Sequence, residues 1–510
     1  MTDRTASVPA FTPTQRTLAA IILSLSNFVV VLDMTVANVS VPHIAGSLGV
    51  SLDQGTWVIT SYAVAEAITV PLTGWLALRF GTVRTFIACM AGFGLFSLLC
   101  GLSLTLEMIV ICRIGQGLCG GLLMPLAQTL LFQVFPGAQR ARAIFLSAMT
   151  TLLAPALGPN LGGFLSDNMS WHWIFLINIP IVIVCAFSVA TLLGKHETER
   201  QKLPIDRVGL GLLILWICCM QLVLDLGRDR DWFADPMILT FGIIAAIGFI
   251  VFLIWELTEE HPIVDLRVFR HPSFTWGLVA LSLCFGAYFA TIVVIPQWLQ
   301  TYMGYPAMLA GFVTSCTAIA AMTTSRLAAK VMARGVDIRL LVSCAIMWLG
   351  CMALVRSQWT SGADFWQLSM PQLFQGFGMA FFMLPLTTLA LGAIPAKELA
   401  SATGMLNFVR TVSVAVSTAV ALTLWGDTQQ EARSELVSRL QPDDAVRTLD
   451  GAGMSAAQVR GVIASIVDKE ATNIAVDYVF LLSAVAFVIG ALAIWLVPRQ
   501  KVASAGRAPN

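Results

Sequence analysis

The sequence FVVVLDMTVAN, residues 28–38, places one acidic residue inside an apolar run. Asp33 is the only formally charged residue between Arg16 and Asp53, and its neighbours suit a helix that spans a membrane. A carboxylate in such a helix is costly to bury, so it should face protein, water or a partner. Because the charge of a buried carboxylate responds to nearby charges, we interpret Asp33 as a proton-coupling site. The alternative is that Asp33 caps or pins a helix.

The composition is that of a membrane protein. Of the 510 residues, 57% are hydrophobic and 12% are charged, which is more apolar than a soluble domain needs. The charges lie between apolar runs, a pattern typical of an all-α polytopic membrane protein. The net charge of +1 gives no indication of a nucleic-acid partner. Residues 1–16 lack a signal-peptide cleavage site, so we expect the first apolar run to remain as a span.

The sequence offers no group of residues suited to a metal or to catalysis. The eleven cysteines lie in apolar runs without a CxxC pair or a Cys/His cluster, so we interpret them as small hydrophobic residues. The five histidines lie near helix ends and form no catalytic cluster. No phosphate-binding Gly-x-x-x-x-Gly-Lys-Ser/Thr loop is present, so ATP is not the expected energy source. We therefore expect no enzyme, no metal and no cofactor.

Fourteen apolar runs are long enough to span a bilayer, which needs about 20 residues. They are 18–42, 54–78, 83–103, 105–134, 139–166, 172–194, 207–226, 236–258, 273–301, 306–333, 337–356, 366–394, 397–425 and 473–497. The loops after even-numbered spans hold fourteen Lys and Arg residues, against three after odd-numbered spans, which are Arg228, Arg230 and Arg356. The positive-inside rule then predicts that both termini are cytoplasmic.

Residues 426–472 interrupt the pattern of short loops and should lie on the outer side. They carry thirteen charged residues, too many for the membrane to hold. Apolar residues recur at helical spacing, which predicts two short amphipathic helices. These residues are Leu436, Leu440, Val459, Ile463, Ile466 and Val467. The segment is either a solvated cap or a docking surface for a partner.

An internal repeat divides the chain into two halves. Shifting the sequence by 259 residues places Gln116–Gly117 on Gln375–Gly376 and Met124 on Met383. Many secondary transporters consist of two such repeats around a site at the membrane midplane. The predicted organisation is an N-terminal segment (1–17), a six-helix half (18–194), a linker with two inserted helices (195–272), a second six-helix half (273–497) and a tail (498–510).

Several motifs are similar to those of one transporter family. Residues 32–39 with Pro42 form a first-span motif, and residues 171–180 form the entry to the sixth span. The fourth-span motif Arg-x-x-Gln-Gly and the fifth-span glycine–proline motif comprise Arg113, Gln116, Gly117, Pro155, Gly158, Pro159, Gly162 and Gly163. With these motifs, the chain resembles the major facilitator superfamily. Within it, the chain resembles the fourteen-span drug:proton antiporters and their EmrB-type inner-membrane pumps.

The resemblance implies a fold and a function. The fold would be two six-helix halves plus two inserted helices, and the location the cell inner membrane. The function would be proton-driven export of hydrophobic or amphipathic compounds by alternating access, in multidrug efflux. The implied partners are an EmrA-like periplasmic adaptor and an outer-membrane channel. Two alternatives stay open: a narrow exporter of fatty acids, a siderophore or another natural product, and a sensor that transports nothing.

One family motif is altered in this chain. The superfamily's cytoplasmic gate loop is matched by Gly74, Arg79, Gly81 and Arg84. Leu78 stands where the family usually has an aspartate. A charge relay through that position is therefore not expected, although the arginines remain able to cap helix ends.

The depth of charged residues in the helices predicts two pairs. At about 1.5 Å per residue, Asp33 and Arg113 lie about 13 Å and about 12 Å below the outer surface. An ion pair between them is therefore expected, the alternative being that Arg113 binds backbone carbonyls. Glu66 and Arg410 lie at about 18 Å and about 22 Å on helices that face each other in the family's architecture. Glu66 is thus a second candidate proton-coupling residue or half of an interdomain latch, unless the cavity wets both side chains separately.

Overall fold

The computed structural model describes residues 11–135, 153–154, 157–158, 161–201, 204–395, 398–439 and 456–498, and in these residues the chain forms helices without strands. Most of the expected fifth span, including Pro155 and Pro159, lies outside the described residues.

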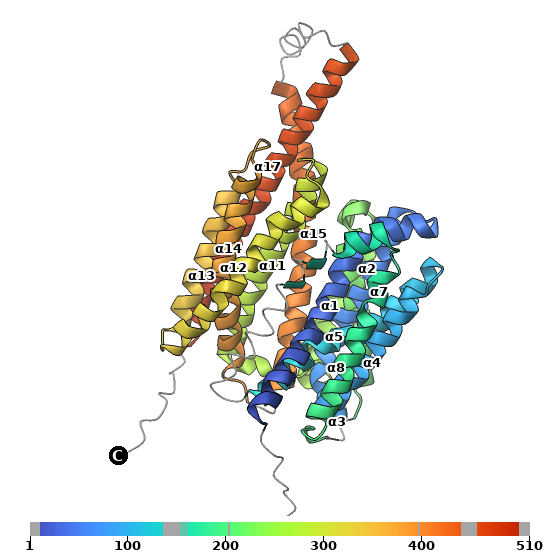
Figure 1. The fold of residues 1–510 in the computed structure, drawn as a ribbon, viewed down its shortest axis with the longest axis vertical. Coiled ribbons are helices and arrows are strands. Elements are labelled where there is room, and N and C mark those ends of the chain that lie inside the picture. Colours follow the sequence, from blue (N-terminus) through green and yellow to red (C-terminus); the bar gives the residue numbers. More distant parts are fainter. Residues whose placement is uncertain are drawn as a thin grey trace, which may run out of the picture.

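The helices form two bundles that stand side by side (Figure 1). The first contains α1 (Pro13–Leu48), α2 (Leu52–Thr69), η1 (Val70–Leu72), α3 (Thr73–Phe80), α4 (Thr82–Gly101), α5 (Leu106–Val134), α7 (Trp173–Leu176) and α8 (Asn178–Leu193). The second contains α11 (Pro272–Thr301), α12 (Ala307–Ala333), α13 (Ile338–Arg356), α14 (Phe365–Leu391), α15 (Leu399–Arg439) and α17 (Ala456–Ala493). Between them in sequence, α9 (Arg207–Leu226) and α10 (Pro236–Thr258) pack on each other, and α9 also contacts α2 and α15.

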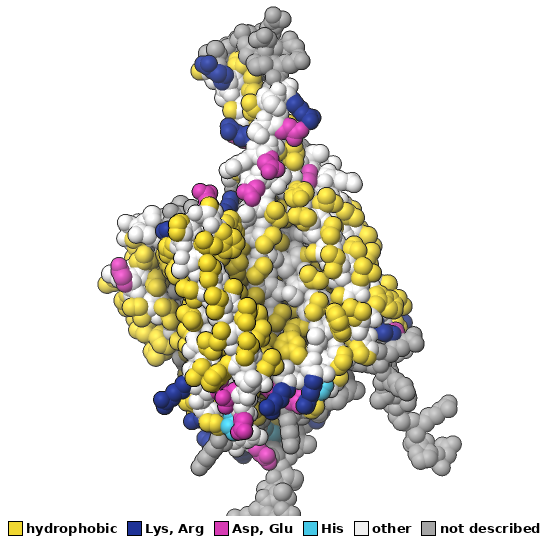
Figure 2. Space-filling model, turned by 180° about the vertical axis from the view of Figure 1, so that it is seen from behind, with side chains coloured by type: hydrophobic (Ala, Val, Ile, Leu, Met, Phe, Trp, Pro, Cys, Tyr) yellow, Lys and Arg dark blue, Asp and Glu magenta, His cyan; other side chains and the backbone are white. Residues whose placement is uncertain are grey.

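The surface and the helix lengths fit a membrane. Figure 2 shows hydrophobic side chains over the sides of the bundles, with most charged side chains at the two ends. Within the described residues, twelve helices are long and apolar enough to cross a bilayer. Helix α12, rich in Ser and Thr, is not among these twelve but packs closely against α14 inside the second bundle. The structure is therefore an all-α polytopic fold with two inserted helices.

The 259-residue repeat extends to the helix boundaries. Helices α1 and α11 begin at Pro13 and Pro272, and α5 and α14 begin at Leu106 and Phe365. Gly117 and Gly376 correspond in this repeat, and each lies at a close contact between two helices of its bundle. A Cβ atom on Gly117 would lie 2.5 Å from the carbonyl oxygen of Tyr62 in α2, and one on Gly376 would clash with the carbonyl oxygen of Thr317 in α12. Small residues at these positions allow the paired helices to approach closely.

The bundles contact each other mainly at the end where α1 begins, which we call the terminal end. There α15 crosses to the first bundle: the hydroxyl oxygens of Thr129 and Thr403 lie 2.9 Å apart, and Asn407 Nδ2 donates to Gln128 Oε1 at 3.1 Å. Gly74 packs directly against Ser401. These contacts close the molecule at its terminal end.

Helices α15 and α17 extend beyond the bundles at the opposite end (Figure 1). They contain 41 and 38 residues, or about 62 Å and 57 Å of helix, whereas a hydrocarbon core is about 30 Å thick. We call their projecting parts, residues 426–439 and 456–472, the hairpin. Arg433 Nε donates to Asp468 Oδ1 at 2.6 Å across it. The prediction of two separate short helices is wrong, because the outer segments continue the two spanning helices without a break; Leu440 lies outside the described residues.

The close contact at Gly74 predicts that a side chain there opens the terminal end. In a background without native cysteines, Thr129→Cys and Thr403→Cys should form a disulfide in high yield, since the two hydroxyls touch. Adding Gly74→Val should lower that yield, because the new Cβ would overlap Ser401. Gly46→Val is the control, since a Cβ there meets no atom within 4 Å. Equal cross-linking yields in the Gly74→Val and Gly46→Val variants would show that the contact at Gly74 is not needed to close the terminal end.

Candidate functional site

The expected pair of charges in the first bundle is present. Arg113 Nη1 on α5 lies 2.6 Å from Asp33 Oδ2 on α1. The two residues are only 1% and 2% exposed, so the pair is shielded from solvent. An ion pair at this depth is stable only when its geometry is good and its remaining hydrogen-bonding groups are satisfied.

Two amides complete the coordination of Asp33. Gln116 Nε2 donates to Asp33 Oδ1 at 3.1 Å, and Asn178 Nδ2 donates to the same oxygen at 2.7 Å. Asn178 also donates to Ser97 Oγ, at 3.1 Å. Both carboxylate oxygens therefore accept hydrogen bonds from side chains of α5 and α8. Asn178 belongs to the family motif at residues 171–180, but the sequence alone gives no indication of its role.

Besides the ion pair, Arg113 makes the contact expected as its alternative, a hydrogen bond to a backbone carbonyl. Its Nε donates to the carbonyl oxygen of Val58 in α2 at 2.9 Å, and its Nη1 donates to Gln116 Oε1 at 2.9 Å. The guanidinium carbon lies 4.3 Å from the centre of the Tyr62 ring, within the range of a cation–π contact. Arg113 thus connects α1, α2 and α5, and a change in the charge of Asp33 would reach all three helices.

The structure does not bring Glu66 and Arg410 together as an ion pair. Glu66 is buried and Arg410 is half-buried, and Glu66 Oε2 is a buried atom without a hydrogen-bond partner among the described residues. Arg410 Nη1 donates to Asn407 Oδ1 at 3.2 Å, and its guanidinium lies 4.4 Å from the ring centre of Phe285. Since Asn407 also binds Gln128 of the first bundle, Arg410 is connected to the contact between the bundles.

The altered gate loop contains a carboxylate that comes from elsewhere in the chain. Glu197, which follows α8, accepts hydrogen bonds from the backbone nitrogens of Val83 at 3.0 Å and Arg84 at 2.9 Å. These N–H groups lie in the first turn of α4, where the backbone offers them no acceptor within the helix. A negative charge is favoured at this end of a helix. Gly81 precedes them with φ +93°. Leu78 carries no charge, but Glu197 provides one at the neighbouring helix start, a contact that sequence spacing did not predict.

The fifth-span glycines contact α1 near Asp33. A Cβ atom on Gly158 would overlap Thr35, and one on Gly162 would lie 3.0 Å from the carbonyl oxygen of Val36. A Cβ on Gly163 would meet no atom within 4 Å. Gly158 and Gly162 therefore allow close packing against α1, one helical turn from the ion pair.

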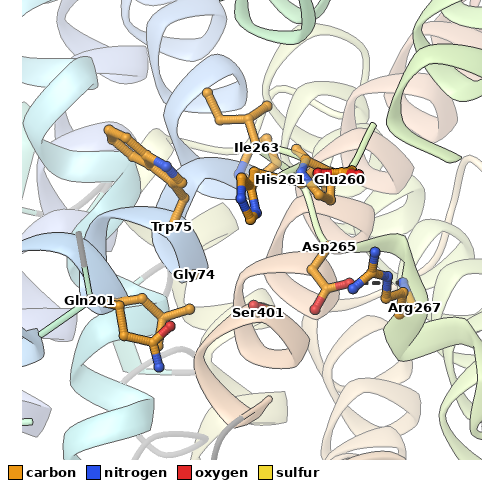
Figure 3. Close-up of a pocket in the computed structure, with 13 residues that line it drawn as sticks. Gly74, Trp75, Gln201, Glu260, His261, Ile263, Asp265, Arg267 and Ser401 are labelled. Carbon is orange, nitrogen blue, oxygen red and sulfur yellow. Dashed lines mark hydrogen bonds between the residues drawn. The ribbon is translucent and has the colours of Figure 1, made fainter. Parts of the chain in front are cut away.

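A cavity of about 430 Å³ lies between the bundles, on the hairpin side of the terminal closure. Thr35, Asn38 and Val39 of α1 line one wall, and residues of α11, α12 and α14 line the other. Thr35 follows Asp33 by two residues, so the same helix, α1, carries the ion pair and part of the cavity wall. A smaller cavity of about 160 Å³ lies at the terminal end, where Trp75, His261 and Ser401 meet (Figure 3).

One arginine that the hydropathy pattern places in an outer loop is buried. Arg356 ends α13 and is 0% exposed. Its guanidinium lies 5.1 Å from the ring centre of Phe480 and does not contribute to a loop charge. Among the described residues, no group of three or more His, Cys, Asp or Glu side chains is arranged to hold a metal ion.

Comparisons with known proteins agree with this architecture. The human organic anion transporter MFSD10 superposes with a TM-score of 0.57 at 14% identity, covering 95% of this chain and all of that chain. A bacterial homologue of the lysosomal transporter Spinster superposes with a TM-score of 0.55 at 12% identity, covering 97% and 100%. At these identities the similarity shows the fold alone.

Similarity in sequence is higher. The Multidrug export protein EmrB of Escherichia coli is 39% identical over 488 residues, which cover 94% of this chain and 95% of that protein. The Fatty acid resistance protein FarB of Neisseria gonorrhoeae is 39% identical over 479 residues, covering 93% and 94%. The Major Facilitator Superfamily profile matches residues 23–418. The chain therefore belongs to the major facilitator superfamily, in the group that includes the EmrB-type drug:proton antiporters.

Proposed function

We propose that this protein is a proton-driven antiporter that exports hydrophobic or amphipathic compounds across the inner membrane by alternating access. The observation that carries the proposal is the buried Asp33–Arg113 pair, held two residues from the wall of the cavity between the bundles. Its relatives include proteins named for multidrug export and multidrug resistance, which also supports an export function. A transporter rather than an enzyme is proposed, with the proton gradient as the energy source.

The proposed coupling follows from the contacts of Asp33. In its charged form, the carboxylate accepts hydrogen bonds from Arg113, Gln116 and Asn178. A proton on Asp33 would remove the charge that attracts Arg113 and one of the acceptor positions. The guanidinium is then free to exchange Asp33 for other acceptors, and α1 is free to shift against α5. Because α1 also lines the cavity, proton uptake and substrate binding become alternatives.

The proposed orientation places the termini in the cytoplasm and the hairpin in the periplasm. The distribution of Lys and Arg between the loops supports it. In this orientation, the bundles are closed at the cytoplasmic end and the cavity lies on the periplasmic side of that closure. This conformation corresponds to the stage of the cycle in which substrate leaves and a proton enters.

We propose the hairpin as the docking surface for an EmrA-like periplasmic adaptor that leads to an outer-membrane channel. The hairpin projects well beyond the bundles, and two of its large apolar side chains are highly exposed: Val437 at 55% and Ile466 at 53%. Exposed apolar side chains on a charged helical surface favour a protein partner over a purely solvated cap.

A narrow exporter of an acidic compound such as a fatty acid is the second candidate function. The similarity to FarB favours it. So does a buried cation in the second bundle, Arg356, which has no ion-pair partner among the described residues.

Neutralising Asp33 should abolish coupled export. Asp33→Asn keeps the size and polarity of the side chain but cannot carry a proton in and out. In proteoliposomes with an imposed pH gradient, this variant should show no uphill transport of ethidium. Asp225→Asn, which changes a half-buried carboxylate on the inserted helix α9, should transport at the wild-type rate. Wild-type uphill transport by Asp33→Asn would move the coupling site elsewhere, with Glu66 the first residue to test.

The ion pair should also contribute to stability as a coupled unit. Removing one partner of a buried pair leaves an uncompensated charge and costs about 3–5 kcal/mol. Asp33→Asn and Arg113→Gln should each lower the thermal midpoint of the purified protein, and the double variant should lose less than the sum. The exposed pair Arg433–Asp468 is the control, where the coupling should be only about 0–1 kcal/mol. Additive losses at Asp33 and Arg113 would contradict their coupling.

Shortening the hairpin should separate transport from assembly. Replacing residues 430–468 by a brief Gly/Ser link should leave transport in proteoliposomes largely intact, because the bundles and the cavity are unchanged. The same variant should lose drug resistance in cells and should no longer co-purify with the adaptor. Recovery of the adaptor at wild-type yield would show that the docking surface lies elsewhere.

A further inference from the structure

The second bundle contains a buried positive charge that its own residues do not neutralise. Arg356 is fully buried, and no Asp or Glu of the described residues forms an ion pair with it. Its Nη1 donates to Gln375 Oε1 and, at 3.3 Å, to Gln372 Oε1. Its Nε and Nη2 atoms are buried and without a hydrogen-bond partner among the described residues. Burying a cation without a compensating charge costs free energy. We therefore expect Arg356 to have a partner that compensates its charge.

The two glutamines that accept hydrogen bonds from Arg356 leave their own donor groups unused. A guanidinium can only donate, so both glutamine oxygens must face it and both Nε2 groups must point elsewhere. Neither Gln372 Nε2 nor Gln375 Nε2 has a partner among the described residues. Gln372, Gln375 and Tyr288 all line the 430 Å³ cavity between the bundles. Two residues of the cavity wall, Gln372 and Gln375, therefore carry unsatisfied N–H groups and are in contact with a buried positive charge.

The first bundle shows which chemical group such donors hold. In the 259-residue repeat, Gln375 corresponds to Gln116 and Gln372 corresponds to Arg113, whose donors converge on Asp33. The residue that corresponds to Asp33 is Ile292, which lines the cavity. The second bundle thus has a cation and amide donors without the carboxylate.

We propose that the carboxylate of an anionic amphipathic substrate occupies this place. Its oxygens accept hydrogen bonds from the Nε2 groups of Gln372 and Gln375, and the Arg356 guanidinium compensates its charge. A charge-assisted interaction in a low-dielectric site is strong enough to select carboxylates over neutral compounds. The apolar part of the substrate packs on the remaining wall, where Val39, Ile292 and Ile295 lie. This inference rests on the proposed export function and assigns its substrate class.

Binding of decanoate and decanamide tests the proposal, since the two share a chain and differ in charge. The protein is placed in phosphatidylcholine nanodiscs at pH 8, and binding of each tritiated probe is measured against empty discs. The wild type should bind decanoate at least about tenfold more tightly than decanamide. Arg356→Gln should remove that preference and leave decanamide affinity unchanged. Arg339→Gln, on the same helix and paired with Asp337, should retain it.

A second variant keeps the test informative when Arg356→Gln fails to fold. Gln375→Glu places a carboxylate beside the guanidinium, so it should raise the thermal midpoint of the ligand-free protein and abolish the preference for decanoate. Equal affinities of the wild type for the two probes, or a preference that persists in Gln375→Glu, would overturn the proposal. Because binding is measured without a proton gradient, its outcome is independent of uphill transport. Failure of the wild type to transport any compound of a panel that includes ethidium and anionic amphipathic compounds would instead refute the export function.

Discussion

A charge buried in the membrane must be compensated, and this constraint explains the core of both bundles. In the first bundle the protein supplies both charges. Asp33 and Arg113 lie in contact, and the amides of Gln116 and Asn178 complete the hydrogen bonds of the carboxylate. The arrangement is stable while the carboxylate is charged and loses its main attraction when the carboxylate takes up a proton. In the proposed mechanism, that dependence gives the bundle two states separated by one proton.

The helices transmit this difference because they are packed closely where the charges lie. Gly117 brings α5 against α2, and Gly158 and Gly162 bring residues of the fifth-span segment against α1. Packed interfaces of this kind move between discrete arrangements rather than deform continuously. In the proposed alternating-access cycle, the closure at the terminal end, where Thr129 meets Thr403, is a contact that one arrangement makes and the other must break.

Much of this architecture could be predicted from the sequence, because helices have a regular rise. Counting residues placed Asp33 and Arg113 at one level, and the ion pair was found. The same count placed Glu66 near Arg410, and no pair formed, because depth along a helix gives no information on the direction of a side chain. Arg356 was misplaced because it is the last residue of its helix, where hydropathy assigns charges to loops.

Contacts between distant segments were not predictable from one sequence. Asn178 reaches Asp33 across 145 residues, and Glu197 caps α4 from beyond α8. The continuous helices of the hairpin were missed for another reason. Charged residues mark where the membrane ends, but they do not end a helix, so α15 and α17 continue into solvent.

In the proposed mechanism Asp33 changes its protonation when substrate binds, and infrared difference spectroscopy measures that change at the carboxyl group itself. Substrate is added to the purified protein, and the carbonyl band of protonated carboxyl groups is followed. If Asp33 is the coupling residue, substrate should remove intensity from this band in the wild type, and the change should be absent in Asp33→Asn. A difference band of equal size in Asp33→Asn, or no band in a wild-type protein that binds substrate, would contradict it.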